Sequence, residues 1–319
     1  MTLALFSILG GLVLLAFGAE CLVRGSSSIA LRMGVTPLVI GLTIVALGTG
    51  SPEMIVSLQA AMSGNSDLAL GNIVGSNICN IALILGIASL ARPLHVRSAL
   101  LQREVPVMIL VTVLLGVLLF DGTLGRLDGI VLAAGAVVYT VATYRAARRD
   151  RDAEVAAEFA RELPKPQSSF TRSAMLVAGG FVGLLVGANV LVSGAVVIAQ
   201  GFGMSQVVIG LTVIAIGTSL PELATSVIAS LRNDADVAFG NVLGSNILNI
   251  LLILGVVAII RPISAAGLRP LDLWVLIGSA VAIYPLMWRG RILNRWEGAM
   301  LLGGYVAYVV FALTDSAGR

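Results

Sequence analysis

Two glutamates lie inside long apolar segments that contain almost no other acidic residues. Glu53 follows Pro52 in the stretch GTGSPE, and Glu222 follows Pro221 in GTSLPE. An ionisable side chain at bilayer depth costs about 2.5 to 3.5 kcal/mol on insertion scales, and no basic residue lies nearby in either segment. Each glutamate is therefore either protonated or neutralised by a bound cation.

Oxygen-bearing groups accompany both glutamates. Each proline, with the glycines upstream, predicts a broken helix, because proline removes a backbone donor and disfavours helical geometry in the preceding residue. A broken membrane helix frees carbonyls that can ligate a cation in a protein-lined cavity. The following segment of each copy carries polar residues every four positions, which places them on one helical stripe. The predicted ligands are the carbonyls of Ala46 and Ala215, the hydroxyls of Thr49, Ser51, Thr218, Ser219, Ser76 and Ser245, and the amides of Asn80 and Asn249.

An all-oxygen ligand set suits hard ions such as calcium and sodium, and not zinc or copper. The only histidine, His95, falls in a predicted loop, and the two cysteines, Cys21 and Cys79, lie in apolar segments as reduced packing residues. Two carboxylates match the charge of one divalent ion. The sequence thus predicts no cofactor, but transported calcium and sodium ions.

Other acidic residues have ordinary explanations. Glu20 and Arg24 are four residues apart and can pair on one helix face. Asp67 and Asp236 begin predicted spans, where a negative charge is favoured by the helix dipole. We therefore expect these acids to have structural roles.

The composition is that of a membrane protein. Of 319 residues, 58% are hydrophobic and 12% are charged, far from the averages of soluble domains. Ten apolar runs of about 20 residues, the length that spans a bilayer, can be placed along the chain, starting with residues 3–23. The net charge of +3 is dispersed among loops, and nucleic acid is not an expected partner.

The chain repeats itself. Shifting it by 169 residues aligns 41–94 with 210–263 without a gap, and 26 of these 54 positions are identical. The shared letters include both PE pairs and GNxxGSNxxN, which begins at Gly71 and Gly240. An internal repeat of this kind is the sequence signature of many secondary transporters.

Each repeat holds five predicted spans, so the second copy must enter the membrane upside down. We predict an all-α fold of ten transmembrane helices in two inverted five-helix repeats, 1–145 and 172–319, joined by a charged cytoplasmic linker, 146–171, with helices 2 and 7 broken. Sixteen of the 20 Lys and Arg residues fall on the linker side. By the positive-inside rule, both termini are extracytoplasmic and the protein is a multi-pass inner (plasma) membrane protein.

The doubled motif, GTGSPE and GTSLPE each followed by GNxxGSNxxN, resembles the paired alpha-repeats of the sodium/calcium exchanger family, within the cation/calcium exchanger superfamily, and closest to its compact prokaryotic members. The resemblance covers essentially the whole chain. It implies that Glu53 and Glu222 bind calcium with Thr49, Thr218 and the two alanine carbonyls, that Ser76 and Ser245 assist sodium, and that Asn80 and Asn249 line the middle. Where the family pattern reads Thr-Ser before the proline, this chain has Gly50, which puts one central oxygen in question.

The function predicted is secondary antiport of calcium against sodium by alternating access. The nearest alternative is calcium/proton exchange by the same fold, since carboxylates also bind protons. An intramembrane enzyme is disfavoured, because no histidine lies in any predicted span and no second acid accompanies either glutamate within its copy. A passive channel is disfavoured because inverted broken helices are typical of transporters.

Overall fold

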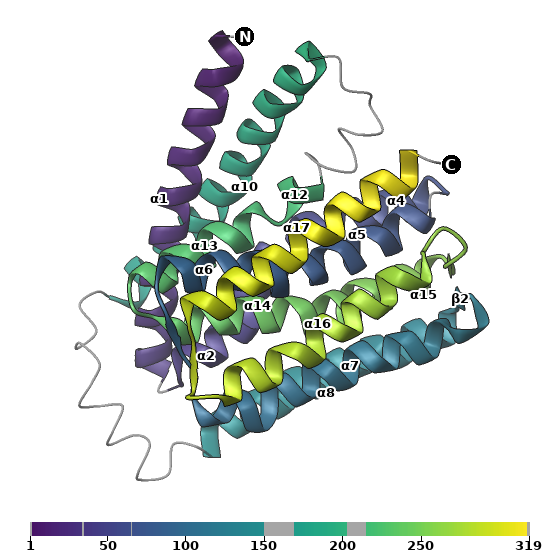
Figure 1. The fold of residues 1–319 in the computed structure, drawn as a ribbon. Helices are drawn as coiled ribbons and strands as arrows, with labels where there is room; N and C mark the ends of the chain where they lie inside the picture. Colours follow the sequence, from purple (N-terminus) through teal and green to yellow (C-terminus); the bar gives the residue numbers. More distant parts are fainter. Residues whose placement is uncertain (1, 34, 65, 150–168, 203–214, 318–319) are drawn as a thin grey trace.

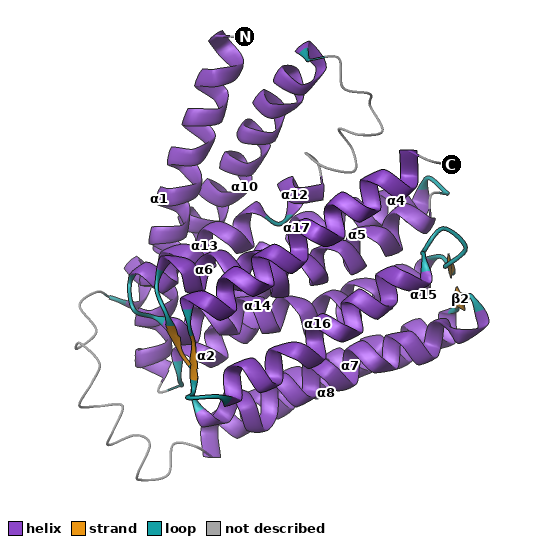
Figure 2. Cartoon of the chain, viewed as in Figure 1, coloured by secondary structure: helices purple, strands orange, loops and turns teal. Residues whose placement is uncertain are grey.

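The structure is a computed structural model that describes residues 2–33, 35–64, 66–149, 169–202 and 215–317. Within these residues the chain is helical apart from two short antiparallel ribbons, as Figure 2 shows. In the part of the chain that the structure describes, seven helices are long and apolar enough to cross a membrane, and a bent pair makes eight. The prediction of an all-α membrane protein is therefore confirmed, whereas the predicted number of ten spans is not confirmed by this count.

The first half of the described chain begins with a long helix, a bent span and a central span. Its elements are α1 (Thr2–Met33), α2 (Pro37–Ile40), the π-helical turn η1 (Gly41–Val45), α3 (Ala46–Thr49), α4 (Ser51–Met62), α5 (Ser66–Ile78), the π-helical turn η2 (Cys79–Ile84), α6 (Leu85–Ala91), β1 (Leu94–His95), η3 (Leu100–Glu104), α7 (Val105–Leu118), η4 (Leu119–Asp121), β2 (Thr123–Leu124) and α8 (Arg126–Arg149).

The second half follows the same order wherever it is described. Its elements are α10 (Phe170–Gly201), α12 (Ala215–Thr218), α13 (Leu220–Leu231), α14 (Ala235–Leu248), the π-helical turn η6 (Asn249–Leu254), α15 (Gly255–Ile260), β3 (Ile263–Ser264), α16 (Pro270–Trp288), β4 (Ile292–Leu293) and α17 (Arg295–Ala317). Most of the predicted linker and the first part of the predicted helix 7 lie outside the described residues.

Two spans form the centre of the bundle. In the most apolar 18-residue stretch of the spans Leu68–Ala91 and Ala235–Ile260, 78% is buried inside the protein, against 28% for α1 and 22% for Phe170–Ile198 of α10. Figure 1 shows α1 and α10 side by side and projecting away from the remaining helices. The molecule therefore has an enclosed centre and a flanking helical pair.

The two ribbons reveal a symmetric relation between the halves. β1 pairs with β4 in the register Leu94↔Leu293, and β2 pairs with β3 in the register Leu124↔Ile263. The shift of 169 residues relates Leu94 to Ile263 and Leu124 to Leu293, so each strand of one ribbon corresponds to a strand of the other ribbon in the opposite half of the chain. A two-fold relation between the repeats requires this exchange of partners.

Small residues allow α1 and α10 to approach closely. A Cβ atom added at Gly18 would lie 2.7 Å from the backbone nitrogen of Leu184, and one added at Gly180 would lie 2.7 Å from the nitrogen of Leu22. Gly11, nearer the start of α1, meets Leu191, nearer the end of α10. The equivalent helices of the two repeats therefore run antiparallel and are packed backbone to backbone, as small residues permit in membranes.

Candidate ion-binding site

Both glutamates begin a helix directly after a break. The helical segment Pro37–Thr49 and the segment Ser51–Met62 are bent by 44° at Gly50, the position at which the sequence predicts a break in helix 2. In the second half, Ser219 separates α12 from α13. Each glutamate lies in the first turn of its helix, where the dipole favours a negative group.

The two carboxylates belong to one buried cluster built from both halves. Glu53 and Glu222 are each 1% exposed. Ser219 of the second half donates a hydrogen bond to Glu53 Oε1 (3.2 Å), and Ser76 lies 3.5 Å from the same oxygen. In the opposite direction, Thr49 of the first half lies beside the Glu222 carboxylate. Each acid is therefore contacted by the copy to which it does not belong.

Amide side chains cross between the halves next to the carboxylates. Asn80 Nδ2 donates to Asn246 Oδ1 (3.2 Å), and Asn249 Nδ2 donates to Asn77 Oδ1 (2.9 Å). The two bonds are equivalent under the 169-residue shift. Asn80 and Asn249 lie in the π-helical turns η2 and η6, and such turns occur frequently at functional sites.

Several buried oxygen atoms of this cluster have no hydrogen-bond partner among the described residues. They are Glu53 Oε2, Glu222 Oε2, Asn80 Oδ1 and Ser245 Oγ. A buried oxygen without a partner carries the full desolvation cost of that group, about 1 to 3 kcal/mol and more when charged. Oxygen atoms in this state are suited to coordinate a hard cation.

The described residues contain no cluster of three or more His, Cys, Asp or Glu side chains that could hold a metal. The negative charge of the described cluster therefore rests on the two glutamates, and the polar side chains that contact them are neutral.

Two further asparagines hold the backbone of the glutamates. Asn72 Nδ2 lies 3.4 Å from the carbonyl oxygen of Glu53 and donates to Ser57 Oγ (3.0 Å). Asn241 Nδ2 makes the same two contacts, with the Glu222 carbonyl (3.2 Å) and Ser226 Oγ (3.0 Å). The predicted ligand set included neither these two asparagines nor the two serines. The signal was available, because Ser57 and Ser226 are identical under the repeat shift.

Two of the predicted ligands are positioned differently from expectation. The break does not free the carbonyl of Ala46, because its oxygen accepts a hydrogen bond from the Gly50 nitrogen (3.0 Å); the helix bends without losing this bond, and one lone pair of the oxygen remains. Ser51 donates its hydroxyl to the carbonyl of Leu47 (3.1 Å). Its hydroxyl proton is therefore used across the break, on a carbonyl of α3.

Most of the other predicted residues are buried. Thr49 is buried and donates to Asn241 Oδ1 (3.0 Å). Thr218, Ser219, Ser76, Ser245 and Asn249 are buried as well. Ala215 is the first residue of α12. The structure thus brings the hydroxyls of Ser219, Ser76 and Thr49 to the two acids, and it buries the other predicted hydroxyls and amides.

Gly50 makes the site asymmetric. It occupies the position equivalent to Ser219, whose hydroxyl contacts Glu53. A Cβ atom added at Gly50 would lie 4.0 Å from Glu222 Oε1 and 3.6 Å from Asn249 Oδ1. Glu222 therefore lacks the serine hydroxyl that Glu53 has.

Two of the acids that the sequence analysis assigns structural roles form ion pairs. Glu20 forms an ion pair with Arg24 (2.6 Å) on the same helix, as predicted, and a second ion pair with Arg232. Asp236, at the start of α14, pairs with Arg97 at 2.9 Å, a partner that the helix-dipole interpretation did not include. The side chain of Asp67 lies outside the described residues.

These features define a polytopic membrane protein with a buried, oxygen-rich, acidic cluster at the meeting point of two repeats. The family model of the sodium/calcium exchanger protein matches residues 3–145 and 172–314. The chain therefore belongs to the sodium/calcium exchanger family.

Relatives match over nearly their full length. The chain is 43% identical to the putative antiporter CaxA of Alkalimonas amylolytica, covering 97% of this chain and 98% of the relative. It is 38% identical to the inner membrane protein YrbG of Escherichia coli (97% and 96% covered) and 31% identical to the sodium/calcium exchanger MaX1 of Methanosarcina acetivorans (97% and 98% covered). A solved structure of the sodium-calcium exchanger NCX_Mj, soaked without sodium or calcium, matches with a TM-score of 0.84 at 32% identity, covering 98% of this chain and 99% of that one.

Proposed function

We propose that this protein, a cation/calcium antiporter by family and fold, exchanges calcium for sodium. The observation that carries the proposal is the set of buried oxygens without partners on both glutamates, Asn80 and Ser245. Two carboxylates balance one calcium ion, and the same oxygens suit sodium. Calcium and sodium then compete for one set of ligands, which is the basis of exchange.

The proposed ligands are the two glutamates with neutral oxygens from both repeats. The neutral ligands are the hydroxyls of Thr49, Thr218, Ser219, Ser76 and Ser245, the amides of Asn80 and Asn249, and the carbonyls of Ala46 and Ala215. Ser51 donates its hydroxyl proton to the carbonyl of Leu47, so its proposed contribution is a lone pair of the hydroxyl oxygen.

The proposed mechanism is alternating access by movement of α1 and α10 past the central bundle. Their shallow burial and their close mutual packing support movement as one pair. An ion-free site leaves two uncompensated carboxylates in a dry interior, which is costly. The empty protein therefore resists reorientation, and each outward ion is coupled to an inward one.

The proposed topology is ten spans in two inverted repeats, 1–145 and 172–319, with the linker 146–171 in the cytoplasm and both termini outside. The exchange of ribbon partners and the antiparallel α1 and α10 support the inversion. The distribution of Lys and Arg supports the orientation.

The test is calcium efflux from loaded proteoliposomes. We expect a sodium gradient to drive efflux and a proton gradient of equal size to drive none, and we expect Glu222→Gln to abolish the sodium-driven flux. Efflux driven by protons alone would replace this proposal with calcium/proton exchange. Efflux that neither saturates nor needs a counter-ion would indicate a channel.

A further inference from the structure

Two polar contacts join α1 to the turn between α13 and α14. Glu20 forms an ion pair with Arg232, in which Nε and Nη2 of the guanidinium each bind one carboxylate oxygen. Ser27 donates a hydrogen bond to Asp234 Oδ2 (2.6 Å). A bidentate pair between arginine and a carboxylate is among the stronger side-chain interactions. The helix that is proposed to move is thus attached to the bundle that is proposed to stay in place.

The turn that carries Arg232 and Asp234 has a defined backbone conformation. Asn233, between them, has a φ of 63°, a left-handed conformation in which asparagine is enriched. The nitrogen of Asn233 donates to the carbonyl of Ser230 (3.0 Å), and that of Asp234 donates to the carbonyl of Ala229 (2.9 Å). The turn leads directly into α14, which belongs to a central, mostly buried span. Both partners of α1 are therefore fixed to the centre of the protein.

An apolar contact lies between these polar contacts and the candidate site. On α13, Leu220, Ala224 and Ile228 recur every four residues and so share one helix face. They pack against an apolar cluster to which α1 contributes, and α1 packs along α13. Glu222 lies in the first turn of the same helix. α1 therefore covers α13 from the buried cluster to the side of the protein on which α1 ends.

The equivalent surface in the other half is not covered in this way. The repeat relates α13 to α4 and α1 to α10, and it places Ile55 and Gln59 at the positions of Ala224 and Ile228. Ile55 is 54% exposed and Gln59 is also exposed, whereas Ala224 and Ile228 are half-buried. Within the described residues, α10 does not pack along α4, and Figure 1 shows it projecting away from that helix. The two halves therefore differ in the contact that alternating access would exchange.

The sequence allows the polar contacts in one half only. The positions equivalent to Glu20, Arg232, Ser27 and Asp234 hold neutral side chains, namely Asn189, Ser63, Val196 and Asn65. The amide of Asn189 donates instead to the carbonyl of Leu185 in its own helix (3.0 Å). No ion pair can form between α10 and the end of α4 at these positions.

We propose that the Glu20–Arg232 ion pair and the Ser27–Asp234 hydrogen bond, together the α1 latch, make the state that is closed on the side where α1 ends the resting state. The inference rests on the proposed alternating access, but not on which ions are exchanged. Two inverted repeats of identical sequence would populate the two states equally. The latch stabilises one of them alone and therefore shifts the populations toward it.

The test is the rate at which a water-soluble maleimide labels a cysteine placed under α1, in the full chain with Cys21→Ala and Cys79→Ala. Ala224→Cys supplies the thiol on the covered face of α13, and Ile55→Cys supplies it at the equivalent exposed position of α4. Labelling is measured without sodium or calcium, so a chain that fails to exchange these ions still reports on the latch. We expect fast labelling of Ile55→Cys and slow labelling of Ala224→Cys.

Loss of the latch should speed the labelling of Ala224→Cys. A hydrogen bond to a charged group corresponds to about a tenfold change in an equilibrium constant. Glu20→Gln and Ser27→Ala should therefore each raise the labelling rate roughly tenfold while the closed state still predominates. The two substitutions together should raise the rate further than either one alone.

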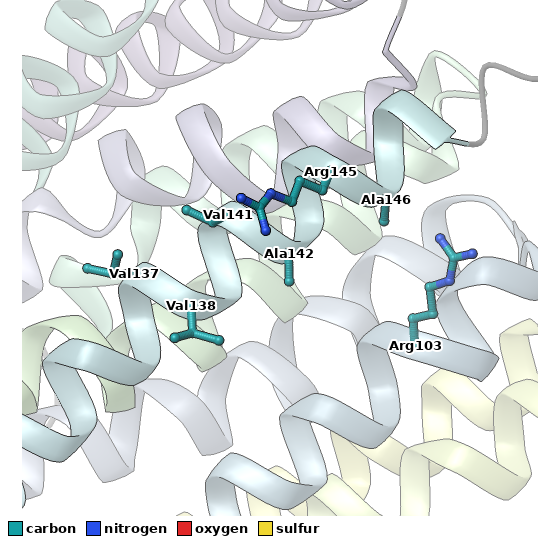
Figure 3. A pocket seen from close by; sticks show the side chains of 7 residues that line it. All are labelled: Arg103, Val137, Val138, Val141, Ala142, Arg145 and Ala146. Carbon is teal, nitrogen blue, oxygen red and sulfur yellow. The ribbon is translucent and has the colours of Figure 1, made fainter.

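The matched control is Arg24→Gln, because Arg24 pairs with Glu20 on the same helix (2.6 Å) and does not join α1 to the turn. Arg145→Gln controls for the loss of a positive charge elsewhere, since Figure 3 shows Arg145 in a groove on α8, outside the latch. Both variants should keep the slow labelling of Ala224→Cys. Labelling is compared below the melting transition of every variant, so unfolded protein does not contribute to the rate.

An unchanged labelling rate in the combined variant Glu20→Gln with Ser27→Ala would overturn the proposal. An equal rise in Arg24→Gln and in Glu20→Gln would overturn it as well, because the charge of α1 and not its attachment to the turn would then control the rate.

Discussion

Replacing one buried glutamate with glutamine tests whether charge matching selects the ion. Glu53→Gln keeps the size and most of the hydrogen-bonding capacity of the side chain and removes one negative charge. Because Glu53 and Glu222 are each 1% exposed, water screens little of this change. The substitution therefore isolates the electrostatic contribution of one carboxylate to ion binding.

The magnitude follows from the ion charges. A unit charge about 4 Å from a sodium ion contributes about 4 kcal/mol at an effective dielectric constant of 20. The same charge contributes about 8 kcal/mol to the binding of calcium, which carries twice the charge. The selectivity for calcium over sodium should therefore fall by up to about a thousandfold, the equivalent of roughly 4 kcal/mol.

The assay is equilibrium binding of radioactive calcium and sodium to the purified protein at fixed pH. Glu104→Gln is the matched control, because Glu104 is also a buried glutamate but bonds to Tyr139 outside the cluster. We expect this control to keep the wild-type ratio of the two affinities. If Glu53→Gln lowers both affinities by the same factor, the carboxylates do not act by matching the ion charge.

Three further substitutions test the packing and the asymmetry of the site. Gly18→Ala places a Cβ atom 2.7 Å from the backbone of α10 and should lower the free energy of unfolding by about 1 to 3 kcal/mol, measured as a lower melting temperature. The control Gly10→Ala, whose added Cβ has nothing within 4 Å, should leave the melting temperature unchanged. Equal melting temperatures of the two variants would contradict the close packing of α1 and α10. Arg97→Gln leaves the buried Asp236 without its ion-pair partner and should lower the free energy of denaturant unfolding by about 2 kcal/mol. This is less than the loss of a fully buried pair, because the side chain of Arg97 is 40% exposed. An unchanged free energy of unfolding would show that the pair contributes nothing to stability. Gly50→Ser restores the missing hydroxyl beside the second glutamate and should lower the sodium concentration for half-maximal calcium efflux from proteoliposomes; an unchanged value would mean that the added hydroxyl does not reach the ion.

Much of the candidate site could be predicted because its signals are local or repeated. The cost of an acid in an apolar segment identifies Glu53 and Glu222 without any knowledge of the fold. The proline before each acid predicts a helix break, and the first segment bends by 44° at Gly50. The 169-residue repeat places corresponding residues in corresponding surroundings.

The sequence by itself determined which residues are chemically unusual, because helix period, proline geometry and the cost of buried charge act along a single segment. Only the tertiary structure decided which of them meet. The contact of Ser219 with Glu53 joins residues 166 positions apart, and the pairing of Asp236 with Arg97 joins a helix end to a distant loop. Such contacts are fixed by how the two halves pack together, and packing is a property of the whole bundle rather than of any one segment.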